Sequence, residues 1–155
     1  MKIITGINRM PITEQTVAAI KEIATKYNVS YSDIAILFPY KQHKLIKYYF
    51  LYWLETALDN ADIPYSLITA SLDGTFDRKR YSETNGVILS TIDSSLGLDF
   101  KAVIVTGLYP YNYVFGDNYY KKTISSWRTI KEMPDDDRDQ VQSQMRSIYT
   151  ACSRA

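Results

Sequence analysis

Cysteine and histidine are almost absent from this chain of 155 residues. The single cysteine, Cys152, excludes an internal disulfide, and with the single histidine, His43, it excludes a metal site built from several Cys and His ligands. No apolar run approaches the ~18 residues that a membrane-spanning helix needs. The N-terminus, Met1 to Gly6, also lacks the apolar core and small-residue cleavage site of a signal peptide. We therefore expect a cytoplasmic protein with no membrane partner.

An excess of charge of one sign is absent too. The 18 Lys and Arg residues nearly balance the 17 Asp and Glu residues, for a formal net charge of +1. Net charge therefore gives no argument for nucleic-acid binding, and any basic surface has to be local. An apolar fraction of 46% and a charged fraction of 23% are ordinary for a globular protein. The length suits one domain with a true hydrophobic core.

Short apolar runs alternate with segments of helical periodicity. We expect a helix from an N-cap at Thr13 to about Asn28 and a second helix over 42–60 with Leu45, Tyr49, Tyr52 and Trp53 along one side. We expect a last helix from about Asp135, with Val141, Met145, Ile148 and Cys152 on one face. Strands are expected over 34–38, 63–68, 86–89 and 102–105, whereas 109–134 reads as an irregular aromatic segment. This order predicts an α/β fold with a mostly parallel sheet flanked by helices.

Tyrosine is abundant, with 14 residues, several of them within 48–53. Beside Lys41, Lys44 and Lys47, this aromatic stretch fits two interpretations. It can be a base-stacking surface for nucleic acid. It can also be ordinary core packing beneath a face of lysine side chains, which is the interpretation we favour.

In parallel sheets ligands bind beyond the carboxyl ends of the strands, which draws attention to 39–41, to 90–100 and to the end of the last helix. In 90–100, Thr91 offers a hydroxyl, Gly97 permits a backbone conformation closed to other residues, and Asp99 offers a carboxylate to a ribose hydroxyl. Spacing alone favours the other interpretation, an ordinary strand–loop–strand connection with a routine turn glycine.

The same stretch resembles motif V of UvrD/Rep-type superfamily 1 helicases, Thr-x-His-x-x-Lys-Gly-Leu-Glu-Phe followed by an apolar strand. Thr91, Gly97, Leu98 and Phe100 match, and Asp99 stands where the family has Glu. Two positions depart from the pattern, since Asp93 replaces the histidine and Leu96 replaces the lysine. A carboxylate repels a backbone phosphate, so these departures weaken the expected contact with nucleic acid.

The end of the chain, 146–155, resembles motif VI of the same helicases, Arg-x-x-x-Tyr-Val-Ala-x-[Thr/Ser]-Arg-Ala. Tyr149, Ala151, Ser153 and Arg154 match, followed by Ala155, and Arg146 lies three residues before Tyr149, one residue nearer than the first arginine of the pattern. The resemblance implies that Arg154 is an arginine finger for the γ-phosphate of ATP, a role for which a permanently charged, fork-shaped donor is suited. A looser resemblance extends over 32–67.

The resemblance implies that 1–155 is the second RecA-like domain of such a helicase, with motif V at 87–105 and motif VI at 146–155. No Gly-x-x-x-x-Gly-Lys-[Ser/Thr] loop occurs in the chain. In the family that loop lies in the first RecA-like domain, so we expect the chain to be a fragment of a larger protein. The short connector 71–85 resembles the compact members that lack a large inserted subdomain.

The resemblance further implies that ATP and Mg²⁺ bind mainly to the missing first domain, with single-stranded or partly duplex DNA, or RNA, as the other partner. Arg154 is the expected catalytic residue, Gly97, Asp99 and Arg146 the expected nucleotide contacts, and Thr91 and Ser94 the expected nucleic-acid contacts. No metal ligands are expected in this chain. One alternative is a degenerate helicase-like domain that acts as a non-catalytic interaction module. Another is an unrelated α/β nucleotide-binding domain.

Overall fold

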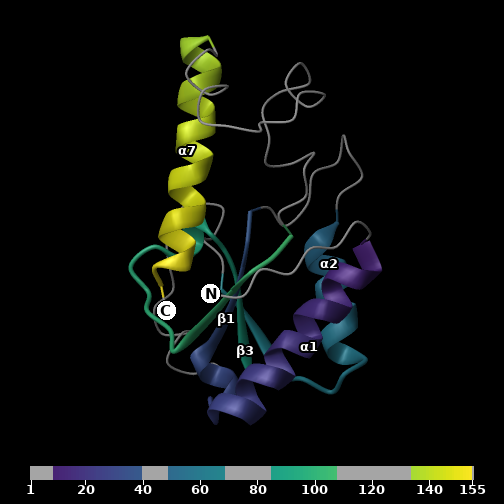
Figure 1. Cartoon of the computed structure of the whole chain (residues 1–155). Coiled ribbons are helices and arrows are strands. Elements are labelled where there is room, and N and C mark those ends of the chain that lie inside the picture. Colours follow the sequence, from purple (N-terminus) through teal and green to yellow (C-terminus); the bar gives the residue numbers. More distant parts are fainter. Residues whose placement is uncertain (1–8, 40–48, 69–84, 108–133, 155) are drawn as a thin grey trace.

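The computed structural model describes residues 9–39, 49–68, 85–107 and 134–154. The helices are α1 (Arg9–Tyr27), α2 (Phe50–Asp59) and α7 (Asp135–Cys152), with short 3₁₀ helices η1 (Tyr31–Asp33) and η3 (Asp93–Ser95). The strands are β1 (Ile34–Phe38), β2 (Tyr65–Ile68), β3 (Val87–Thr91) and β4 (Ala102–Val105) (Figure 1). The predicted segments 42–48, 71–84 and 109–133 lie outside the described residues.

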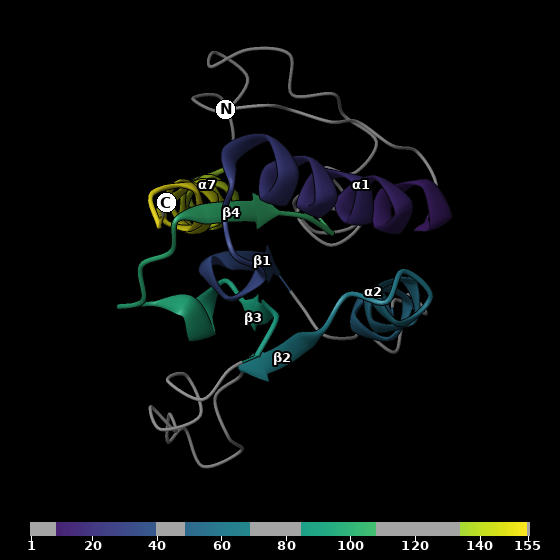
Figure 2. The ribbon, with the colours of Figure 1, turned by 90° about the horizontal axis from the view of Figure 1, so that it is seen from below.

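The four described strands form one sheet in the order β2-β3-β1-β4, and every pair is parallel. The register sets Leu37 of β1 opposite both Ser90 of β3 and Val105 of β4, so the carboxyl ends of these strands lie at one edge. Figure 2 shows α1 and α2 on one side of the sheet, with α7 and the segment around η3 on the other. The predicted α/β fold with a mostly parallel sheet flanked by helices is confirmed, and the helices on its two faces give it three layers.

Strand β1 lies inside the sheet, and all five of its residues are buried. Because side chains alternate along a strand, its odd and even positions pack on opposite faces. Ile34, Ile36 and Phe38 belong to the cluster under α1 and α2, whereas Ala35 and Leu37 belong to the cluster under η3 and α7. This two-sided burial explains why the strand appears in the sequence as a continuous apolar run.

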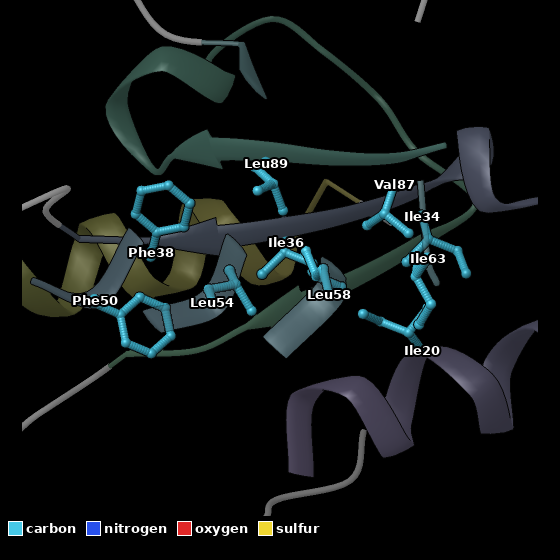
Figure 3. Close-up of a cluster of buried hydrophobic side chains, with 10 residues drawn as sticks. All are labelled: Ile20, Ile34, Ile36, Phe38, Phe50, Leu54, Leu58, Ile63, Val87 and Leu89. Atoms are coloured by element: carbon cyan, nitrogen blue, oxygen red, sulfur yellow. The ribbon is translucent and has the colours of Figure 1, made fainter. Parts of the chain in front are cut away.

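The larger cluster joins the sheet to α1 and α2 and is shown in Figure 3. Its buried members are Ile20, Ile34, Ile36, Phe38, Phe50, Leu54, Leu58, Ile63, Val87 and Leu89. The smaller cluster is formed by Ala35, Leu37, Ile68, Ile88, Ile92, Phe100 and Ala151. Phe100 and Ala151 come from the two motif-like segments, so these segments take part in one core.

Two predicted helix details are wrong. Helix α1 begins at Arg9, so Thr13 lies inside it and is not its N-cap. Pro11 permits this earlier start, because the first backbone N–H groups of a helix have no intrahelical partner to lose. In α2 the buried residues are Phe50, Leu54 and Leu58 rather than the predicted aromatic side.

The tyrosines of the predicted aromatic side point largely to solvent. Tyr49 and Tyr52 are 40% and 69% exposed, while Trp53 is half-buried and meets the Tyr49 ring edge-on at 6.4 Å between ring centroids. The predicted side chain Leu45 lies outside the described residues. Helix α2 packs Phe50, Leu54 and Leu58 against the sheet instead. These residues are spaced by four, so they share one face of the helix.

Helix α7 begins at Asp135 as predicted, but its predicted apolar face is wrong in two of four positions. Met145 is 49% exposed and Cys152 is exposed, whereas Ile148 is half-buried and Ala151 is fully buried. The side chain of Val141 lies outside the described part. Figure 1 shows that only the C-terminal part of α7 lies against the sheet, while its N-terminal part extends beyond it. None of the described helices is long and apolar enough to cross a membrane.

Candidate functional site

The carboxyl ends of β1 and β3 form a topological switch point. These strands are neighbours, but the chain passes from β1 to β2 on one side and from β3 to β4 on the other. A backbone hydrogen bond from the Ile92 N–H to the Phe38 carbonyl, 3.0 Å long, holds the two strand ends together. Ligands of open parallel sheets bind outside such points. Pro39, the first residue beyond β1, is buried here, and the predicted neighbours 40–41 lie outside the described residues.

Thr91 and Ser94, the predicted nucleic-acid contacts, lie together at this edge. The Thr91 hydroxyl donates to the Ser94 hydroxyl at 2.8 Å, and the Ser94 N–H donates to the Thr91 hydroxyl at 3.2 Å. Both side chains are half-buried, and their bonds hold the first turn of η3. Asp93 is exposed between them, so the edge offers hydroxyl groups and a carboxylate.

Gly97 lies in the loop after η3 with a φ of +82°, a conformation that side chains with a Cβ rarely adopt. A Cβ built there would meet no atom within 4 Å, so the requirement for glycine is conformational and not steric. This agrees with the predicted role of Gly97 in shaping the loop. Its neighbour Leu96 is 60% exposed, which puts an apolar group on the surface where the helicase pattern has lysine.

The two motif-like segments meet through their backbones. The Phe100 N–H donates to the Arg154 carbonyl at 2.8 Å, across a separation of 54 residues in the chain. Asp99 therefore immediately precedes Phe100, whose backbone is hydrogen-bonded to that of Arg154. Phe100 and Ala151 pack in the same buried cluster and strengthen this contact. Of the predicted site residues, Asp99 and Arg154 form one group and Thr91 and Ser94 form another.

The end of α7 lies at the amino edge of the sheet, not at the carboxyl edge where the sequence directed attention. Phe100 precedes β4 by two residues, and the adjacent Lys101 N–H donates to the Asp33 carbonyl just before β1 (Figure 1). The loop 92–101 therefore carries the chain from one edge to the other. The predicted motif V spans both edges, because a parallel connection has to return to the start of the next strand.

Arg154 is half-buried, and its Nε is buried without a hydrogen-bond partner among the described residues. A buried guanidinium nitrogen that lacks an acceptor is costly, so an anionic group that reached it would satisfy a donor already in place. Arg146, the other predicted nucleotide contact on α7, is exposed two turns earlier, about 12 Å away along the helix axis.

One neighbour of this group was missed in the sequence. Lys101 Nζ lies 2.8 Å from the Asp33 carboxylate, at the same edge as Asp99 and Arg154. The side chain of Lys101 is 70% exposed, so the pair contributes little to stability, and its two charges balance each other at this edge. The two residues are 68 positions apart, and only the pairing of β1 with β4 brings them together.

Shifted ionisation is found elsewhere, on α2 and at the start of β2. Burial raises the pKa of the Glu55 carboxyl, and the negative charge of Asp59, one turn later, raises it further. Burial also raises the pKa of the Tyr65 hydroxyl, with Asp59 and Glu55 adding to the effect. These groups lie outside both motif-like segments, and they belong to the region where α2 and the start of β2 come together.

Among the described residues, no group of three or more His, Cys, Asp or Glu side chains is placed to hold a metal ion. No protein-family model and no curated protein sequence matches this chain.

Proposed function

We propose that this chain is the second RecA-like domain of a UvrD/Rep-type ATP-dependent helicase or translocase. In this proposal ATP and Mg²⁺ bind mainly to a first RecA-like domain that carries the phosphate loop. This chain supplies Arg154 to the γ-phosphate and Asp99 to the ribose, and cleft closure moves a nucleic-acid strand across the carboxyl edge of the sheet. The domain partner is that first domain, and the polymer partner is DNA or RNA.

The observation that carries the proposal is the hydrogen bond from Phe100 to Arg154. Two segments that resemble successive helicase motifs lie side by side, so a carboxylate and an arginine stand at one edge of the sheet. An arginine aimed at developing phosphate charge contributes roughly 10³–10⁵ in rate in phosphoryl transfer. The unpaired Nε of Arg154 among the described residues supports the fit of an anionic ligand to this group.

The decisive experiment uses a protein that joins this chain to a phosphate-loop domain. Arg154→Ala is expected to lower nucleic-acid-stimulated ATP hydrolysis by at least about 10³-fold. Arg138→Ala is the matched control, because it removes an arginine of α7, the helix that precedes Arg154, and the ion pair of Arg138 is with Asp135. Equal rates for the two variants would remove Arg154 from the site. The chain alone lacks a phosphate loop, and robust ATP turnover by it would contradict the shared-site proposal.

A second candidate is a non-catalytic module that has kept the helicase-like fold. Asp93 and Leu96 favour it, because both are exposed and present a negative charge and an apolar group to any approaching phosphate backbone. Replacing both by the family residues, Asp93→His with Leu96→Lys, is expected to strengthen salt-sensitive binding of a single strand in fluorescence anisotropy. Unchanged affinity would show that this loop does not contact the backbone.

A further inference from the structure

The dipeptide Asn85-Gly86 directly precedes β3, at the amino edge of the sheet. Asn85 is the only asparagine in the chain that is followed by glycine, and it is exposed. Its main-chain carbonyl accepts a hydrogen bond from the Ser66 hydroxyl of β2 at 3.3 Å. This bond and the start of β3 together place the dipeptide beside β2.

The fold requires glycine at position 86. Its φ is +93°, and an added Cβ would lie 2.1 Å from the Pro64 carbonyl oxygen. Because glycine has no side chain, the Gly86 nitrogen is sterically open to the side-chain amide of Asn85. Among the described residues no hydrogen bond engages the Gly86 N–H, whereas the next N–H, that of Val87, donates to the Pro64 carbonyl at 2.8 Å. The fold thus keeps an open backbone nitrogen next to an exposed asparagine.

We propose that Asn85 is a site of spontaneous deamidation in the folded protein. The Gly86 nitrogen, after its proton passes to a base in the solvent, attacks Cγ of Asn85 and forms a new C–N bond. The bond from Cγ to the side-chain nitrogen then breaks, and that nitrogen leaves as ammonia with a proton taken from the solvent. The product is a five-membered succinimide ring between the two residues.

Water then opens the ring at one of its two carbonyl groups. Breaking the bond between the ring nitrogen and Cγ leaves an aspartate with the ordinary main chain. Breaking the bond to the main-chain carbonyl carbon leaves an isoaspartate, whose main chain runs through the former side chain and is one carbon longer. That extra carbon enters the chain just before the Val87 N–H, so we expect isoaspartate to break the hydrogen bond from Val87 to Pro64. The reaction consumes only water, and it does not depend on the proposed helicase role.

Asn60 provides a comparison within the same chain. It is exposed like Asn85, but the next residue, Ala61, carries a Cβ, and the Ala61 N–H donates to the Leu58 carbonyl at 3.1 Å. Attack by the Ala61 nitrogen would therefore require a hydrogen bond to break first. Deamidation is expected at Asn85 and not at Asn60 under the same conditions.

Incubation of the full, folded chain at mildly alkaline pH, followed by digestion and mass spectrometry of the peptides, tests the proposal. Both aspartate and isoaspartate are expected at position 85, and conversion should be slower at mildly acidic pH because the attacking nitrogen has to lose its proton. Asn85→Gln should abolish the conversion, since its longer side chain would have to close a six-membered ring. An intact Asn85 amide, equal conversion at Asn60, or conversion only in urea would overturn the proposal. Aspartate without isoaspartate would exclude the succinimide route.

Thermal unfolding tests the consequence for the fold. The purified isoaspartate form is expected to have a Tm about 2–4 °C below that of the unmodified chain, the shift for one lost backbone hydrogen bond in a protein of this size. Asn85→Asp is the matched control, because it adds a carboxylate at the same exposed position without lengthening the main chain, and its Tm should be nearly unchanged. Equal Tm values for the isoaspartate form and Asn85→Asp would overturn the expected break of the bond from Val87 to Pro64.

Discussion

Gly86, at the start of β3, combines a positive φ with a close backbone neighbour. Its φ is +93°, and a Cβ added there would lie 2.1 Å from the Pro64 carbonyl oxygen and 2.3 Å from its carbon. The same carbonyl accepts a 2.8 Å hydrogen bond from the Val87 N–H, which ties the chain before β2 to the start of β3. Neither backbone segment can move away without breaking this bond.

We expect Gly86→Ala to lower the free energy of unfolding by about 3 kcal/mol or more. The positive φ costs about 1–2 kcal/mol for a residue with a Cβ. Displacing the Pro64 carbonyl costs about 1 kcal/mol for the lost hydrogen bond, with a further cost for distorting the backbone. For a chain of this size, each 1 kcal/mol lowers Tm by roughly 2–4 °C.

Gly97 provides the matched control, because it shares a positive φ, +82°, but its added Cβ meets nothing within 4 Å. Gly97→Ala should therefore cost only the conformational part, about 1–2 kcal/mol. Urea denaturation followed by circular dichroism measures both variants, with comparable m-values as the condition for comparing them. Equal losses for the two variants would refute the argument that the Pro64 carbonyl makes Gly86 necessary.

Three further predictions concern the core and one carboxyl group. Leu54→Ala removes a fully buried side chain of α2 and should cost about 2–5 kcal/mol, whereas Tyr52→Ala on its 69% exposed neighbour should change stability by less than about 0.5 kcal/mol in urea denaturation. Ala151→Leu enlarges a fully buried position between α7 and the sheet and should cost about 1–3 kcal/mol, and an unchanged Tm would mean that α7 is not packed there. Glu55 has a raised folded-state pKa, from burial first and Asp59 second, so its ionisation disfavours folding above that pKa and has no effect below the unfolded value. Glu55→Gln should therefore raise Tm at pH 7 and not at a pH well below 4.5, and an equal effect at both pH values would exclude the charge as the cause.

Much of the fold followed from local patterns. The strand Ala102–Val105 and the beginning of α7 at Asp135 agree with the sequence-based expectations, because apolar runs and acidic helix starts are local features. The end of α1 is also local, since Asn28 has a φ of +52° and closes the helix in the left-handed conformation that asparagine tolerates. The predicted parallel sheet followed from the alternation of elements, which leaves few other topologies.

The buried faces of α2 and α7 did not follow from the sequence. Periodicity identifies residues that share a face but does not say which part of a helix meets the sheet. The N-terminal part of helix α7 extends beyond the sheet, and Met145 and Cys152 are exposed although their spacing suits one buried face. Helix α2 has an aromatic face and a face with Leu54 and Leu58, and it is the face with Leu54 and Leu58 that packs against the sheet.

The sequence by itself determined the parallel α/β class, the candidate residues and the glycine at position 97, because these depend on residue type and on near neighbours along the chain. Only the tertiary structure decided how the candidates are grouped. It separates Thr91 and Ser94 at the carboxyl edge from Asp99 and Arg154 at the amino edge. The physical reason is the parallel direction of the strands, since β4 runs in the same direction as β3 and the connecting loop has to cross from the carboxyl edge of the sheet to its amino edge.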